Sequence, residues 1–129
     1  MKSYNLSYGK GKLIFDLPEE IELELIEANQ VSAIKDYKRK FKSILNDPIN
    51  TPPLTDIVSK GETVVIIVSD ITRSAYKTDL YLPILIDELN KIGVSDEDIT
   101  IVIATGTHRS HSAKEDELVV GTEVYNRVK

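Results

Sequence analysis

Two continuous apolar runs constrain the fold of this chain more than any other feature of its sequence. Thr63 to Val68 and Asp98 to Ala104 each have the length of a strand and are almost entirely aliphatic, as buried strands are. Residues 79–91, between them, carry apolar side chains at helical spacing, and Gly93 is a natural helix end. Strand, helix and strand in this order predict parallel pairing, a right-handed crossover and a sheet covered on both faces.

The residues after the second run extend this pattern. Ser112, with Glu115 three residues later, forms a capping box and predicts a helix that starts near Ala113. The closing VGTEVYNRVK is expected in or near a final helix. Pro83 must lie in the first turn of helix 79–91, or the helix is kinked there. The predicted class is α/β, with a Rossmann-like parallel βαβα core.

Short strands and a helix precede that core. Residues 2–26 predict strands, with a hairpin turn at Tyr8 to Gly11 and a half-buried strand in the alternating IELELIE, residues 21–27. Apolar side chains at helical spacing predict a helix over residues 32–45, and Pro53 is suited to open a short helix after it. The lysines and arginine on the other face of helix 32–45 are interpreted as a solvated surface rather than a polyanion site.

Length and composition exclude several classes of protein. The 129 residues fit a single domain, and the net charge of −5 argues against nucleic-acid binding. Cysteine is absent, which excludes disulfides, thiolate metal sites and a cysteine nucleophile. The N-terminus lacks the apolar core of a signal peptide, and no aliphatic run is long enough to span a bilayer. A cytoplasmic protein without membrane contact is expected.

Polar side chains follow both apolar runs at the point where each strand ends. Asp70, Thr72 and Arg73 follow the first run, and TGTHR, with His108, follows the second. Ligands of such sheets gather beyond the carboxyl ends of the strands, so we expect these side chains to face one cleft. Arg73 is suited to hold a carboxylate by two parallel hydrogen bonds, and His108 to take and return a proton, oriented by Asp70 or a threonine.

Each of these residues also has a purely structural interpretation. Asp70 and Thr72 are residue types that cap loops, and Arg73 and Arg109 are typical surface arginines paired with local acids. His108 and His111 have the spacing of a metal pair, but no third ligand is evident nearby, so no metal site is predicted; His111 is expected to be exposed. Dinucleotide, P-loop and nucleophile-elbow motifs are missing.

The two polar motifs carry a resemblance to a known family. SDITR and ATGTHR, each after an apolar strand, together with residues from about Asp47 to the closing VGTEVYNRV, resemble the N-terminal domain of the nickel-dependent lactate racemase family. The resemblance implies an isomerase that interconverts the enantiomers of a 2-hydroxy acid by hydride transfer to a nickel pincer nucleotide. It assigns His108 as a proton-transfer histidine, Arg73 as the ligand of the substrate carboxylate, and Asp70 and Thr72 to the cofactor side of the cleft.

The same resemblance implies that much of the enzyme lies elsewhere. The family's second catalytic histidine, its cofactor-tethering lysine and its nickel ligand belong to a later segment that is not found before Lys129. Residues 1–129 are therefore expected to form one domain of a longer two-domain racemase, inactive alone and able to self-associate through surface that the missing C-terminal domain covers. Ser74 stands where proline is usual, which leaves the 2-hydroxy acid open. The alternative function is a stand-alone module that binds a carboxylate or phosphate through Arg73, Arg109 and loop amides without catalysis.

Overall fold

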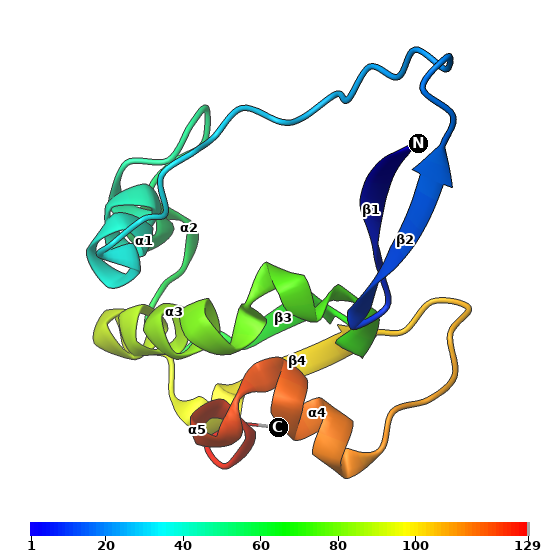
Figure 1. The fold of residues 1–129 in the computed structure, drawn as a ribbon. Helices are drawn as coiled ribbons and strands as arrows, with labels where there is room; N and C mark the ends of the chain where they lie inside the picture. The colour runs from blue at the N-terminus through cyan, green and yellow to red at the C-terminus, as the bar shows by residue number, and fades with distance from the viewer. Residues whose placement is uncertain (129) are drawn as a thin grey trace. The chain divides into compact units, whose positions relative to one another are not determined.

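The computed structural model describes residues 1–128 and divides into two compact units, the first covering Met1–Ala33 and the second beginning at Ile34. The first unit carries one hairpin, and the second carries all the helices of the described chain and the parallel sheet (Figure 1). The organisation of residues 1–129 as a single domain of a longer two-domain protein stays a prediction.

The first unit is built around an antiparallel hairpin, as its sequence predicts. Strand β1 (Lys2–Tyr8) pairs with β2 (Gly11–Leu17) in a register that sets Tyr8 opposite Gly11. Gly9 occupies the turn with φ +57°, a left-handed conformation that glycine adopts without steric cost. On one face, the rings of Tyr4 and Phe15 stack with centroids 5.8 Å apart.

The strand predicted for residues 21–27 is wrong. These residues form no regular structure and are all exposed, including Leu25 at 63% and Ile26 at 90%. A strand needs a neighbour to accept and donate its backbone hydrogen bonds, and the hairpin strands pair only with each other among residues 1–128. The alternation is present in the sequence, but the described chain offers no partner for it.

The second unit surrounds a two-stranded parallel sheet. Its elements are, in chain order, α1 (Tyr37–Asn46), α2 (Leu54–Ile57), β3 (Val64–Ser69), the 3₁₀ helix η1 (Ile71–Tyr76), α3 (Thr78–Ile92), the 3₁₀ helix η2 (Asp96–Asp98), β4 (Ile99–Ala104), α4 (Ala113–Val120) and α5 (Thr122–Tyr125). β3 and β4 run parallel, in register from the pair Val64 and Ile99 to the pair Ser69 and Ala104. The predicted α/β class and its parallel strand–helix–strand core are confirmed.

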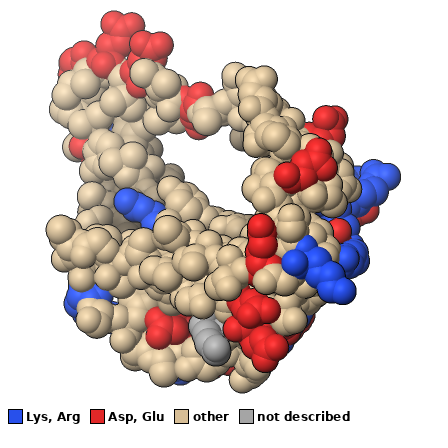
Figure 2. Space-filling model, turned by 180° about the vertical axis from the view of Figure 1, so that it is seen from behind, with Lys and Arg blue, Asp and Glu red and all other residues tan. Residues whose placement is uncertain are grey.

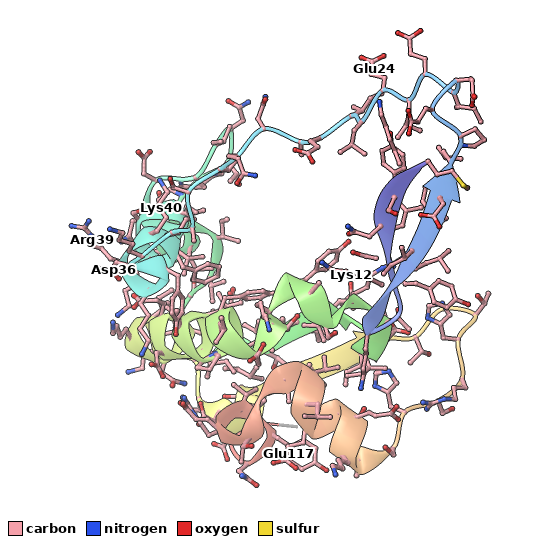
Figure 3. The ribbon with its side chains drawn as sticks, viewed as in Figure 1. Lys12, Glu24, Asp36, Arg39, Lys40 and Glu117 are labelled. Atoms are coloured by element: carbon pink, nitrogen blue, oxygen red, sulfur yellow. The ribbon has the colours of Figure 1, made fainter. Side chains whose placement is uncertain are left out.

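Capping decides where two helices begin. The Asp36 carboxylate accepts a hydrogen bond from the Arg39 backbone N–H at 3.0 Å, so α1 starts at Tyr37, later than the apolar spacing predicts. Figure 3 labels Asp36, Arg39 and Lys40 at this helix start. The predicted capping box of Ser112 and Glu115 is confirmed and opens α4.

Helices cover one face of the sheet only, so the prediction of two covered faces is wrong for the described chain. The buried cluster between the sheet and helices α3, α4 and α5 consists of Val68, Leu82, Ile86, Leu89, Val94, Ile99, Val119, Val120 and Val124. On the opposite face, Val65, Ile67 and Val102 are 58%, 71% and 44% exposed. The view from behind shows an uncharged area that is bordered by acidic and basic side chains (Figure 2). We call Val65, Ile67 and Val102 the outer sheet face.

The outer sheet face supports the expected self-association. A contiguous apolar surface of this kind is typical of contacts between chains, and parallel sheets are ordinarily covered on both faces. We expect the mass of the 129-residue chain from light scattering to rise with concentration, and Ile67→Lys to abolish that rise. A wild-type chain that stays monomeric at high concentration would contradict the prediction.

Pro83 lies in the second turn of α3, because that helix already begins at Thr78. Proline has no N–H to donate, so the Asp79 carbonyl lacks its usual partner four residues on. Gly121, at the junction of α4 and α5, packs close to this carbonyl with φ +85°. A Cβ at Gly121 would meet the Asp79 oxygen at 3.4 Å.

Replacing Gly121 by alanine is expected to destabilise the chain through its backbone, which combines φ +85° with ψ 145°, a conformation that residues with a Cβ rarely adopt. Gly61 is the matched control, with φ +79° and no atom within 4 Å of the point that an alanine methyl group would occupy. Gly61→Ala should cost about 1–2 kcal/mol because its φ is positive, and Gly121→Ala should cost more because φ +85° with ψ 145° is a region that essentially only glycine occupies. Urea unfolding of both variants measures the difference in the free energy of unfolding; equal losses would show that the extended ψ of Gly121 adds no strain.

Candidate active site at the carboxyl edge of the sheet

The register of the sheet sets two polar loops at one edge. Ser69 is paired with Ala104, so the segments that begin at Asp70 and Thr105 both leave from the carboxyl end of the sheet. The predicted juxtaposition of the two loops is confirmed by direct contact between a side chain of each, Asp70 and His108. Ligands of parallel sheets bind at such an edge.

Asp70 is the buried centre of this contact, with 4% of its surface exposed. It caps η1, and its Oδ1 accepts hydrogen bonds from the Thr72 backbone N–H at 3.2 Å and the Thr72 hydroxyl at 2.6 Å. The Thr72 hydroxyl is the main cause that lowers the pKa of Asp70, and His108 is the next. The Asp70 side chain is thus an ionised, almost fully enclosed acceptor.

His108 contacts the other oxygen of that carboxylate. Its Nδ1 forms a hydrogen bond with Asp70 Oδ2. An ionised carboxylate only accepts, so His108 Nδ1 carries a proton, and in the neutral form of the ring Nε2 holds the lone pair. The His108 side chain is 51% exposed, and its Nε2 has no hydrogen-bond partner among residues 1–128. The imidazole is therefore oriented from one side and accessible from the other.

Arg73 lies close by in η1 but takes no part in that contact. Its backbone breaks the 3₁₀ helix at φ −105° and ψ 24°, and its exposed guanidinium has no hydrogen bond or ion pair within the described part of the chain. Arg73 lines a cavity of about 260 Å³ together with Asp70, Lys77 and Asp79. His108 is not among the residues that line this cavity, so a cleft common to Arg73 and His108 stays a prediction.

Arg109 is occupied by a local acid, as its structural interpretation predicts. Its guanidinium donates to both oxygens of Glu115, at 3.0 and 2.6 Å, and this pairing holds the pKa of Glu115 well below its usual range. The carboxylate at the same time completes the capping box of α4. An anion-binding module that relies on Arg109 would have to break this bidentate pair.

Comparisons with known proteins decide the family. Residues 8–129 match the family described as the lactate racemase N-terminal domain. The chain belongs to this family. The lactate racemase of Thermoanaerobacterium thermosaccharolyticum is 33% identical over 126 residues, which are 96% of this chain and 29% of that protein. The solved structure of the lactate racemase apoprotein from the same organism superimposes with a TM-score of 0.72 at 31% identity, over 98% of this chain and 29% of that one.

The chain thus spans less than a third of the length of the lactate racemase that it matches. Both motifs that carry the resemblance, SDITR and ATGTHR, lie inside the matched range, and so do Asp70, Arg73 and His108. Within residues 1–128, no three histidine, aspartate or glutamate side chains gather as a metal site. No helix of the described residues has the length and apolarity needed to cross a membrane.

Two residues at this edge escape a sequence-based search. His111, expected to be exposed, has only 4% of its side chain exposed, and its ring contacts the Ile71 backbone N–H and the Asp116 carboxylate. Lys77 lines the cavity beside Arg73 and holds a left-handed backbone at φ 57°, which is uncommon for a residue with a side chain. Neither position follows a strand directly, so no pattern of strand ends reveals them.

Proposed function

We propose that this chain is the part of a cytoplasmic 2-hydroxy-acid racemase that supplies one proton-transfer histidine and the substrate-carboxylate arginine. The hydrogen bond between Asp70 and His108 carries the proposal, because it leaves an oriented, solvent-accessible Nε2 at the sheet edge. Family membership supports the reaction class, since the relative is a lactate racemase. The activity requires the C-terminal domain, so the 129-residue chain alone is inactive.

In the proposed reaction, His108 Nε2 accepts the proton of the substrate hydroxyl as the carbon–oxygen bond becomes a carbonyl, and returns it when the hydroxy acid forms again. Asp70 fixes the ring with Nε2 toward the substrate and stabilises the positive charge that the ring acquires. Arg73 binds the substrate carboxylate through two parallel hydrogen bonds, for which its guanidinium, without a partner among residues 1–128, has its donors free. The carboxylate clamp and the proton acceptor together orient the carbon that changes configuration.

The nickel pincer nucleotide, when bound, supplies the acceptor for the α-hydrogen as hydride. Of the two residues assigned to its side of the cleft, exposed Thr72 fits a contact with a polar group, although its hydroxyl proton is already given to Asp70. Asp70 is 4% exposed and its oxygens accept from Thr72 and His108, which favours a role through His108 over direct contact with the cofactor. The tethering lysine and the nickel ligand are assigned to the C-terminal domain.

Joining residues 1–129 to the C-terminal domain of a lactate racemase tests the proposal. With the pincer cofactor added, chiral chromatography should detect interconversion of a 2-hydroxy acid, and the 129-residue chain alone should show none. A joined protein that binds the cofactor but racemises no 2-hydroxy acid would contradict the function. A rise in the melting temperature of the 129-residue chain with carboxylate or phosphate, without racemisation, would favour the anion-binding module.

Arg73→Ala in the joined protein is expected to weaken substrate binding, because it removes a charge-assisted bidentate contact. KM should rise by about 10-fold or more, equivalent to at least 1.4 kcal/mol, with a smaller change in kcat. Arg109→Ala is the matched control, since that guanidinium is already paired with Glu115. Equal KM values for the Arg73 variant and the unsubstituted protein would exclude the assigned role.

A further inference from the structure

The two catalytic loops are joined at a second point besides Asp70 and His108. His111 Nε2 accepts a hydrogen bond from the Ile71 backbone N–H at 3.2 Å, across 40 residues of sequence. His111 Nδ1 lies 3.1 Å from Asp116 Oδ1 on α4. With 4% of its side chain exposed, His111 is more deeply buried than His108, whose side chain is 51% exposed.

These contacts define the protonation state of His111. A backbone N–H can only donate, so Nε2 must hold a lone pair and the ring proton must reside on Nδ1. That proton points to the Asp116 carboxylate, which accepts it. A doubly protonated ring would place Nε2–H against the Ile71 N–H, donor against donor. His111 is thus suited to a fixed, neutral Nδ1–H form and not to proton transfer.

The position of His111 links it to the proposed proton acceptor. Ile71 directly follows Asp70, and His111 lies three residues after His108. The hydrogen bonds from Ile71 to His111 and from His108 to Asp70 therefore close a small ring of chain, in which each bond restrains the other. Without the hydrogen bond from Ile71 to His111, the loop that carries Asp70 would no longer be held at Ile71 to the loop that carries His108.

From this geometry we infer that His111 is a positioning residue, which holds the loop after β3 so that Asp70 meets His108 Nδ1. The inference rests on the proposed function for the meaning of that alignment, but the alignment itself is measurable without activity. His111 does not touch the substrate or the reacting atoms. It acts through the backbone of Ile71, and Asp116 orients its ring in turn.

Nitrogen-15 NMR of the histidine-labelled chain tests the inference, because the sequence contains two histidines. When its rings are neutral, the wild-type chain should show both with Nδ1 protonated and Nε2 unprotonated. His111→Gln places an amide oxygen near the position of Nε2 and retains an acceptor for Ile71, whereas His111→Leu fills the space without one. In either variant, the remaining ring signal belongs to His108.

We expect His108 in His111→Gln to keep the wild-type Nδ1–H signal. In His111→Leu, the Nδ1 signal of His108 should shift toward the averaged value of a free imidazole. The Nδ1 proton should also exchange faster with solvent. Arg109→Ala is the control for disturbance of the same loop and should leave the His108 ring unchanged. An unshifted His108 ring in folded His111→Leu would overturn the inference.

The wild-type spectrum is an independent criterion in case His111→Leu does not fold. A His111 ring protonated on Nε2 could not accept from Ile71 and would also overturn the inference. If the joined protein fails to racemise any 2-hydroxy acid while the His108 ring responds to His111 as expected, the proposed function is wrong and the positioning role stands. The two failures are therefore distinguishable.

Discussion

His108→Ala in the joined racemase is expected to lower kcat by about 10²–10⁴-fold, the usual contribution of a positioned general base. The half-exposed ring presents its Nε2 at the sheet edge, and alanine offers no group to take the hydroxyl proton. KM should change little, because the carboxylate is bound by Arg73. Initial rates of racemisation from each enantiomer, measured by chiral chromatography, give both constants.

His108→Ala should also leave the fold intact, because the histidine contributes no apolar surface to the buried cluster. Circular dichroism and the melting temperature check this point. If His108→Ala retained a normal kcat in both directions, the assigned proton-transfer role would be excluded. A low kcat with a collapsed melting transition would instead indicate unfolding, and His108→Gln would then replace alanine in the test.

Asp70→Asn is expected to have an effect of similar size, on the order of 10²–10⁴-fold in kcat, although the side chain differs by one atom. The Asp70 oxygens accept hydrogen bonds from Thr72 and His108 on both sides. An asparagine amide has one acceptor and one donor group, so it must turn an N–H toward either Thr72 or His108. In the second arrangement, the imidazole proton moves to Nε2 and the base is lost.

Thr72→Ser and Thr72→Val distinguish the parts of this network. Serine keeps the hydroxyl that donates to Asp70 at 2.6 Å, so kcat should stay close to that of the unsubstituted protein. Valine removes the donor and should lower kcat less than Asp70→Asn does, because the carboxylate and its contact with His108 remain. An Asp70→Asn protein as active as Thr72→Ser would contradict the orienting role of the carboxylate.

The pH dependence of the same network follows from the direction of its pKa shift. The pKa of Asp70 is lowered below 3.8, chiefly by the Thr72 hydroxyl and next by His108. Because the pKa of Asp70 is lower in the folded state, its ionised carboxylate stabilises the fold. This contribution to the free energy of unfolding is complete above the unfolded-state pKa and is lost as the pH falls through the folded-state pKa. Carbon-13 NMR should find Asp70 still ionised at pH 3.8, and Thr72→Val should raise its titration midpoint.

The core of the fold was predictable because burial leaves a direct mark on sequence. The runs Thr63 to Val68 and Asp98 to Ala104 correspond to the paired strands β3 and β4, because their apolar side chains favour buried strands. The capping box at Ser112 and the hairpin turn at Gly9 were predictable for a local reason, since each depends on a few adjacent residues.

Features that depend on a distant partner were not predictable. IELELIE alternates as a strand does, but pairing is decided by a neighbour, and the described residues supply none. The outer sheet face could not be recognised because Val65 and Ile67 read as buried strand residues, whereas burial depends on what covers them. His111 was expected at the surface for the same reason: only the fold shows that Ile71 lies against it.

At the candidate site, the sequence indicated which residues lie close together but not which of them bind one another. The strand-end rule brought Asp70 and His108 to one edge, and the structure pairs them. The two arginines looked alike in sequence, but Arg109 is bound to Glu115 while the Arg73 guanidinium has no partner within the described chain. That difference rests on the position of α4, which no spacing in the sequence reveals.

We propose that His108 and Arg73 act on one substrate molecule. A crystal structure of the joined racemase with a bound 2-hydroxy acid would show whether both residues contact the same molecule. We expect the substrate carboxylate on the Arg73 guanidinium and the substrate hydroxyl within hydrogen-bond distance of His108 Nε2. A 2-hydroxy acid bound by Arg73 with its hydroxyl turned away from His108, or bound at a place that touches neither, would contradict it.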